Sequence, residues 1–229
     1  NNPLQKTKVL QTYFDTMLLK DLVEHYKLKN IEALRYFLKR IMANLTKPTS
    51  IRAIFGDIKS QNLKVGKNDL YEWAGYACNI FLFIRVPNFN KSLKKIESSL
   101  PKYYCIDNGL YSSVLLPQSD DDGKKLENTV FLHLYRHKTP IQQIFYYQGK
   151  AECDFLIQSG VSIEQLIQVT WRMDNEETRK REIRGLVEAA ELTGCKNLCI
   201  ITADTQEVIT LDNGLEIKVI PAWRWLLGR

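Results

Sequence analysis

Three oxygen-bearing side chains give this sequence its candidate chemistry: Glu127, Asp154 and Gln168. Carboxylate and amide oxygens suit Mg²⁺, which keeps several of its waters and therefore needs few protein ligands. A Mg²⁺ ion held in this way can activate water and neutralise the charge that develops on a phosphodiester. The sequence therefore predicts metal-assisted phosphodiester hydrolysis, with Mg²⁺ bound by Glu127 and Asp154 and the site completed by Gln168.

A site of this kind usually also carries a lysine two residues after the last ligand, because alternate residues of a strand share one face. Thr170 stands at that position. Lys150, two residues before Glu152 on a predicted turn, could supply the positive charge from another part of the backbone. The candidate catalytic residues are therefore Glu127, Asp154, Gln168 and Lys150.

The elements that must position these residues make up the second half of the chain. Glu127 lies near the start of a predicted helix, Asp154 follows a turn at Gly149-Lys150, and Gln168 lies on a buried strand. The order helix, three strands, helix, strand predicts a mixed sheet flanked by helices. The predicted elements are a helix at 125–136, two strands within 144–157, a strand at 166–170, a helix at 175–193 capped by Asp174, a strand at 197–201, a hairpin at 207–220 and a short helix from Pro221.

The first half predicts a winged helix-turn-helix, because helices are followed by a strand, a basic loop and a returning strand. Ser50 is the predicted N-cap of the third helix. In this fold the helix at 68–79 enters the major groove of DNA, and the loop at 90–95 is the wing that contacts phosphate. The predicted elements are helices at 8–28, 32–44, 51–60 and 68–79, a strand at 80–86, the basic loop at 90–95 and a strand at 102–106.

The charge distribution favours DNA contact by this first half. Residues 1–102 carry 18 Lys+Arg and 8 Asp+Glu, whereas the remainder carries 14 basic and 18 acidic residues. A basic excess of this size favours contact with phosphate. The alternative is a winged helix that serves packing or protein contacts, with its lysines simply solvated. The candidate DNA-binding residues are Lys67, Asn68, Tyr71, Lys91, Lys94 and Lys95.

An acidic, turn-rich stretch at 117–124 is the best candidate for a domain boundary and predicts domains at 1–116 and 117–229. No apolar run approaches the roughly 20 residues that span a bilayer, and the N-terminus lacks a signal-peptide pattern. The five cysteines lack the spacing of a zinc site. We therefore expect reduced thiols packed in a core, in a cytoplasmic protein with no membrane partner.

Six short motifs, in this order, carry a resemblance to a known family. The chain resembles the C-terminal region of bacterial and archaeal AAA-type ATPases, in which a winged helix precedes a restriction-endonuclease-like PD-(D/E)xK domain of unknown function. The resemblance covers essentially the whole chain. The motifs are residues 13–15 with 20–22, 65–71, 101–110, 126–131, 152–155, and 168–170 with 177–182.

The resemblance implies an α/β protein, α+β overall, that works on DNA as one module of a longer ATPase. The partners expected from it are DNA and the missing ATPase domain of the same polypeptide, and it leaves room for a homo-oligomer. ATP would bind only in that missing N-terminal domain, because Gly66-Lys67 is not preceded by the glycine of a phosphate-binding loop.

Two functions stay open at this stage. The first is a Mg²⁺-dependent endonuclease acting on branched or duplex DNA; glutamine at the position of Gln168 occurs in working members of the wider nuclease superfamily. The second is an inactive nuclease-like domain that binds DNA or a protein and regulates the ATPase. In that case Glu127 would be an acid favoured by the helix dipole, Asp154 a strand-end acid and Gln168 a buried amide bonded to backbone.

Overall fold

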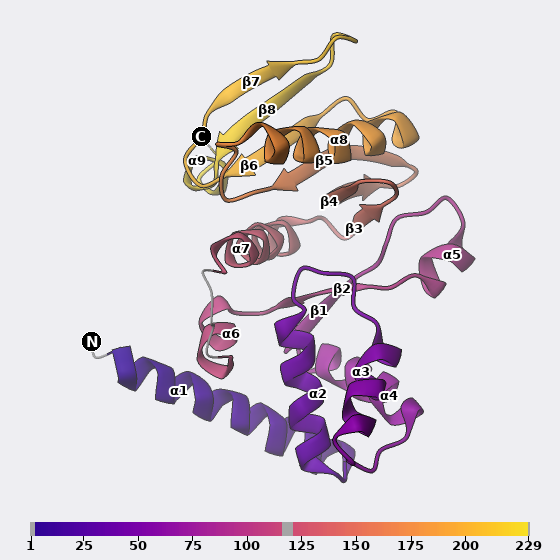
Figure 1. Ribbon diagram of the computed structural model, residues 1–229, viewed down its shortest axis with the longest axis vertical. Coiled ribbons are helices and arrows are strands. Elements are labelled where there is room, and N and C mark those ends of the chain that lie inside the picture. The colour runs from indigo at the N-terminus through magenta and orange to yellow at the C-terminus, as the bar shows by residue number, and fades with distance from the viewer. Residues whose placement is uncertain (1–2, 116–120, 229) are drawn as a thin grey trace. The chain divides into compact units, whose positions relative to one another are not determined.

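Two units make up the chain in the computed structural model, which describes residues 3–115 and 121–228 (Figure 1). The first unit contains residues 1–85 and 100–120, and the second contains 86–99 and 121–229. The fold is α+β, as predicted: helices accompany a two-stranded sheet and a mixed six-stranded sheet. The predicted boundary between 116 and 117 falls at residues 116–120, which lie outside the described part of the chain.

Helices dominate the first unit, and their apolar faces form its core. Its elements are α1 (Pro3–Thr16), the π-helix η1 (Met17–Glu24), α2 (Ile31–Ala43), α3 (Ile51–Ser60), α4 (Lys67–Asn79), β1 (Phe83–Val86), β2 (Lys102–Cys105) and α6 (Asn108–Val114). Phe37 of α2 and Trp73 of α4 meet edge to face, with ring centroids 5.9 Å apart. The predicted cap of α3 is confirmed, since the Ser50 hydroxyl accepts a hydrogen bond from the Ala53 N–H at 3.2 Å.

The long helix predicted at 8–28 is present, but residues 17–24 form a π-helix instead of an α-helix. Phe14, Leu18 and Leu22 are buried at a spacing of four residues. The wider turn of a π-helix, with its i→i+5 hydrogen bonds, keeps residues at that spacing on one face. Val9 and Tyr13, which the helical pattern places inward, are half exposed, because α1 buries only its other face.

The predicted wing loop at 90–95 is also partly wrong, because residues Leu93–Ser98 form the short helix α5. The residues before it lie along β3 (Gln142–Gln148), the edge strand of the six-stranded sheet. There the Phe89 N–H donates to the Tyr146 carbonyl at 2.7 Å, and the Phe89 and Phe145 rings meet edge to face. Residues 86–99 therefore belong to the second unit, whereas the sequence assigns them to the first.

The second unit has the predicted order of helix, three strands, helix and strand. Its further elements are α7 (Asp122–His137), β4 (Glu152–Ser159), β5 (Ser162–Val169), α8 (Glu176–Thr193), β6 (Leu198–Thr202), β7 (Glu207–Thr210), β8 (Glu216–Pro221) and α9 (Ala222–Leu226). The sheet order is β3-β4-β5-β6-β8-β7, with β5, β6 and β8 parallel and the other pairs antiparallel. Asn175, rather than the predicted Asp174, caps α8, because its side chain accepts from the Thr178 N–H.

Helices cover both faces of this sheet (Figure 1). Leu186 of α8 packs in one apolar cluster with Leu166 of β5 and Ile200 of β6. On the other face, the Phe131 ring of α7 stacks on Phe155 of β4, with centroids 6.1 Å apart. Because successive strand residues point to opposite faces, the residues of β5 that share a face with Leu166 lie under α8.

The cysteines are free thiols, as predicted, and four of the five are buried. Burial raises the pKa of the Cys105 and Cys199 thiols to about 12. None of the helices in the described ranges is both long enough and apolar enough to cross a membrane.

Close contact between α8 and the β3–β4 hairpin fixes the region that carries Lys150 and Asp154. A Cβ atom added to Gly185 would lie 1.8 Å from the Glu152 carbonyl oxygen, so the helix touches the strand at backbone distance. One turn further along, the Glu188 carboxylate accepts hydrogen bonds from the N–H groups of Lys150 and Ala151, at 2.9 and 2.8 Å, and from the Tyr147 hydroxyl at 2.9 Å. The turn is thereby tied to the helix.

We expect Gly185→Ala to lower the free energy of unfolding by roughly 1–3 kcal/mol, although alanine normally favours a helix by about 1 kcal/mol over glycine. The overlap is with backbone, so α8 must move to relieve it. Gly123→Ala is the matched control, because Gly123 lies in α7 of the same unit with nothing within 4 Å of its added Cβ. Urea unfolding of both variants checks this; equal stability of the two would contradict the close approach.

We expect Glu188→Gln to destabilise the second unit in a pH-dependent way. The pKa of Glu188 is lowered by the hydrogen bond from the Lys150 N–H, with smaller contributions from Tyr147 and Ala151. A carboxylate whose pKa is lowered by folding stabilises the fold above its unfolded pKa, and this stabilisation is lost as the pH falls through the lowered value. The difference from wild type in melting temperature should therefore be present at neutral pH and shrink below about pH 4. Glu191→Gln, an exposed site on the same helix, is the control, and a difference that does not change with pH would count against the clamp.

Candidate functional site

The four candidate catalytic residues line one pocket of the second unit. This cavity of about 410 Å³, here called the Asp154 pocket, opens where α8 crosses the β3–β4 hairpin. The structure thus brings together side chains from the helix α7, from the hairpin and from β5, which are separated by up to 41 residues in the chain. The lining residues are Glu127, Gln148, Lys150, Ala151, Glu152, Asp154, Gln168, Val169, Arg181, Glu182 and Arg184.

Strand register places Asp154 opposite Gln168. Phe155 of β4 pairs with Ile167 of β5, so Asp154 and Gln168 follow as the next pair. The Gln168 amide oxygen accepts from the Asp154 N–H at 3.1 Å, and the Asp154 carboxylate accepts from the Val169 N–H at 2.9 Å. Asp154 is therefore held at both its backbone and its side chain.

Gln168 connects Asp154 to a residue that the sequence did not single out as part of the site, Glu182 of α8. The Gln168 amide nitrogen donates to Glu182 Oε2 at 2.6 Å. Glu182 is buried, and its Oε1 accepts from Arg181 Nε and Nη2 at 3.1 and 2.6 Å. The result is a continuous hydrogen-bonded chain from Arg181 through Glu182 and Gln168 to Asp154, here called the Arg181–Asp154 chain.

The environment of Glu182 opposes its charge. Burial raises the pKa of Glu182, the hydrogen bond from Arg181 acts in the opposite direction, and the charge of Asp154 adds to the rise. One signal could have identified this residue in the sequence. Glu182 falls at helical spacing with Leu186 and Ala189, on the buried face of α8, where an acid needs a partner.

The position expected for a catalytic lysine does not contribute to the pocket lining. The Thr170 hydroxyl donates to the Arg172 carbonyl at 3.1 Å, and its N–H donates to the Ile201 carbonyl at 3.0 Å. Three cations line the pocket instead: Lys150 on the turn, and Arg181 and Arg184 on α8.

The residues of the pocket fit a hydrated Mg²⁺ ion better than a fully protein-bound one. Within the described ranges, no three His, Cys, Asp or Glu side chains are grouped closely enough to hold a metal between them. Mg²⁺ commonly takes one or two carboxylates and keeps several waters. Glu127 and Asp154 supply two carboxylates to one cavity, whereas the Gln168 oxygen is already bonded to the Asp154 N–H.

The candidate DNA-binding residues lie in two groups. Lys67, Asn68 and Tyr71 are exposed at the N-terminal end of α4, where the Lys67 ammonium lies 6.0 Å from the centre of the Tyr71 ring. Asp69 caps the start of this helix by accepting from the Gly66 N–H at 2.8 Å. The lysines of the predicted wing are exposed as well, but they belong to the second unit; these are Lys91, Lys94 and Lys95.

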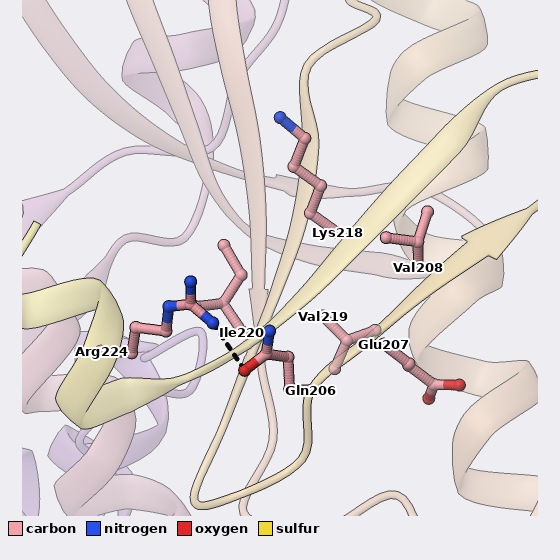
Figure 2. A pocket seen from close by; sticks show the side chains of 7 residues that line it. All are labelled: Gln206, Glu207, Val208, Lys218, Val219, Ile220 and Arg224. Atoms are coloured by element: carbon pink, nitrogen blue, oxygen red, sulfur yellow. Dashed lines mark hydrogen bonds between the residues drawn. The ribbon is translucent and has the colours of Figure 1, made fainter. Parts of the chain in front are cut away.

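A second cavity, of about 330 Å³, lies at β7, β8 and α9. Figure 2 shows that its charged side chains point apart: Lys218 and Glu207 extend away from Arg224, which donates to Gln206 at 2.7 Å. Glu207 is already paired with Arg179, through hydrogen bonds of 2.6 and 2.9 Å. This cavity therefore lacks the convergent polar groups of the Asp154 pocket.

Comparison with known proteins gives relatives without an assigned activity. The uncharacterized protein MJ1544 of Methanocaldococcus jannaschii is 33% identical over an alignment of 230 residues, which covers 97% of this chain and 50% of that protein. An uncharacterized protein of Haemophilus influenzae is 23% identical over 136 residues, which are 59% of this chain and 34% of that protein. The chain thus spans half or less of the length of these relatives.

No solved structure matches the chain. Residues 1–121 match a family described as a domain of unknown function, DUF8612, and this range covers more than half of the sequence. The protein therefore belongs to the DUF8612 family.

Proposed function

We propose that this protein is a DNA-directed module whose Asp154 pocket hydrolyses phosphodiesters as a Mg²⁺-dependent endonuclease. The observation that supports the proposal is convergence. Metal-dependent nuclease chemistry requires its ligands in one place. Glu127, Asp154 and Gln168 come from separate elements, and all three line one pocket together with Lys150. A pocket that combines carboxylates with cations suits a metal ion and a phosphate group side by side.

Each residue has a task in this proposal. Glu127 and Asp154 would hold Mg²⁺, which when bound supplies an activated water and neutralises charge on the phosphate. The Val169 N–H fixes the Asp154 carboxylate, and Gln168 fixes the Asp154 backbone. Lys150, on a turn clamped by Glu188, would offer its ammonium to the substrate phosphate.

We extend the proposal to the whole polypeptide: the chain is the C-terminal module of an AAA-type ATPase. MJ1544 has about twice the length that this chain covers, which leaves room for an ATPase domain as the part that binds ATP. The partners are then DNA and that domain, in an assembly that can be homo-oligomeric. Free, mostly buried thiols suit the cytoplasm.

A second function is favoured by one specific observation. The Gln168 oxygen is engaged by backbone, and Thr170 replaces the expected lysine outside the pocket lining. An inactive nuclease-like domain that binds DNA or a protein, and so regulates the ATPase, would keep this arrangement. The two functions differ in one respect, which is cleavage.

We expect cleavage of labelled duplex or branched DNA with Mg²⁺ or Mn²⁺, and a loss of about 100-fold or more in Asp154→Asn. Asparagine is nearly isosteric and can still accept from the Val169 N–H, so folding should be retained. Asp212→Asn, at an exposed acid outside the pocket, is the control. Gel assays under single-turnover conditions measure the rates. Cleavage that survives Asp154→Asn would contradict hydrolysis in the Asp154 pocket, and no cleavage with DNA binding retained would leave the inactive module.

For the first unit we expect Lys67→Ala to weaken binding of duplex DNA similarly for different sequences and to reduce the salt dependence of affinity by about one ion. Lys39→Ala removes an equal charge from the exposed face of α2 and is the matched control. Fluorescence anisotropy over a salt series measures both variants. Equal effects of the two changes would indicate general charge rather than a groove-facing α4, and absence of binding at low salt would point to a protein partner.

A further inference from the structure

The pocket must provide a cation for phosphate from somewhere other than position 170. Four carboxylates line it, those of Glu127, Glu152, Asp154 and Glu182, against three cations. Such a balance repels a phosphodiester unless a positive group is directed at it. Thr170 makes its contacts elsewhere, so the group has to come from the hairpin or from α8.

Among the three cations, Arg181 has the best-defined orientation. Lys150 lies on the clamped turn, where its charge contributes to the lowered pKa of Glu188, and Arg184 is exposed on α8. Arg181 directs Nε and Nη2 at one oxygen of Glu182. Asp154 and Arg181 are also close enough that the Asp154 charge contributes to the raised pKa of Arg181, after the larger effects of Glu182.

Arg181 keeps donors available for a ligand. A guanidinium has five N–H donors in a fixed fork, and the contacts with Glu182 use the donors of Nε and one Nη2 hydrogen. The Arg181 side chain is 65% exposed, so a strand of DNA can reach it. The Glu182 side chain is 6% exposed and fixes the guanidinium from the buried side. An arginine fork of this kind suits the oxygens of a phosphate group.

We propose that Arg181 binds a phosphate oxygen of nucleic acid at the Asp154 pocket, and that Glu182 is the positioning residue that directs it. The Arg181–Asp154 chain then couples the phosphate-binding cation to the strand that carries the proposed metal ligand. This inference rests on the proposed function, because it names the group that holds the substrate of the same site.

The test is binding of a fluorescein-labelled DNA duplex to the full chain in Ca²⁺, measured by anisotropy over a salt series. Arg181→Ala should bind on the order of tenfold more weakly, with a salt slope lower by about one ion. Lys180→Ala is the matched control: it removes the same charge from the neighbouring position of α8, outside the pocket lining, where Lys180 is 75% exposed. Its affinity should stay within about twofold of wild type.

Three further variants separate phosphate contact from structure. Arg181→Lys keeps the charge, so it should restore the salt slope but only part of the affinity, because an ammonium lacks the fork. Glu182→Gln should lower affinity with the slope unchanged, since Arg181 is kept but loses its direction. The double variant Arg181→Ala/Glu182→Gln leaves no uncompensated buried acid, and it should still bind as weakly as Arg181→Ala. Thermal unfolding reports whether each variant is folded.

The outcomes separate a failure of this inference from a failure of the proposed endonuclease function. Equal behaviour of Arg181→Ala and Lys180→Ala, with tight binding by wild type, overturns the role of Arg181 and leaves the proposed function standing. Recovery of wild-type affinity in the double variant also overturns it, because the loss would then come from an unpaired Glu182. Absence of DNA binding by wild type at every salt concentration overturns both. A loss of DNA affinity in Arg181→Ala but not in Lys180→Ala supports phosphate binding by Arg181. If wild type also fails to cleave DNA with Mg²⁺ or Mn²⁺, hydrolysis is rejected while phosphate binding stands.

Discussion

The backbone-distance contact of α8 with β4 at Gly185 is the constraint on which the rest of the candidate site depends. With no side chain between them, the helix lies directly on the strand, and the residues about one turn to either side meet the hairpin and the neighbouring strand β5. Glu188 binds the turn that carries Lys150, and Glu182 meets Gln168. A larger residue at 185 would move α8 away from the strand. Glu182 and Glu188 would then both lose their contacts, because both lie on that helix.

Much of the second unit could be predicted because its signals are local. The turn at Gly149-Lys150 separates two apolar runs, and strands adjacent in sequence pair as neighbours, so Asp154 and Gln168 come together with little tertiary information. One error concerns tertiary context. The loop predicted at 90–95 is in part the helix α5, and the Phe89 ring before it packs on Phe145 of β3, a contact that a run of lysines does not indicate. The other error is a helix boundary, since Asp174 and Asn175 are adjacent and both residue types can cap a helix.

Glu182 and Arg181 are the part of the site that the sequence did not indicate, because their contacts are also made in the folded structure. Charged residues on a helix usually face solvent, so a stretch rich in Arg, Lys and Glu at the start of α8 gives no strong sign of a pocket. Glu182 is stable in its buried position because Gln168, fourteen residues away, donates to it and Arg181 covers it. Helical spacing shows that Glu182 is inward, but the sequence alone cannot show which partner it meets.

The same network gives a physical reason for glutamine at position 168. Gln168 donates to the Glu182 carboxylate through its amide nitrogen and accepts from the Asp154 backbone N–H through its amide oxygen. The carboxylates of Asp154 and Glu182 lie close enough that the Asp154 charge contributes to the raised pKa of Glu182. An ionised glutamate there would have no donor to offer and would place a third negative charge beside the two, which a buried site disfavours. Gln168 and Glu182 therefore form one hydrogen-bonded unit, in which the amide on the strand links the helix carboxylate to the backbone of Asp154. If the pocket binds a metal as proposed, Glu127 and Asp154 would be its ligands, while Glu182 is bonded to Arg181. Metal and phosphate would then be held by different residues of one pocket.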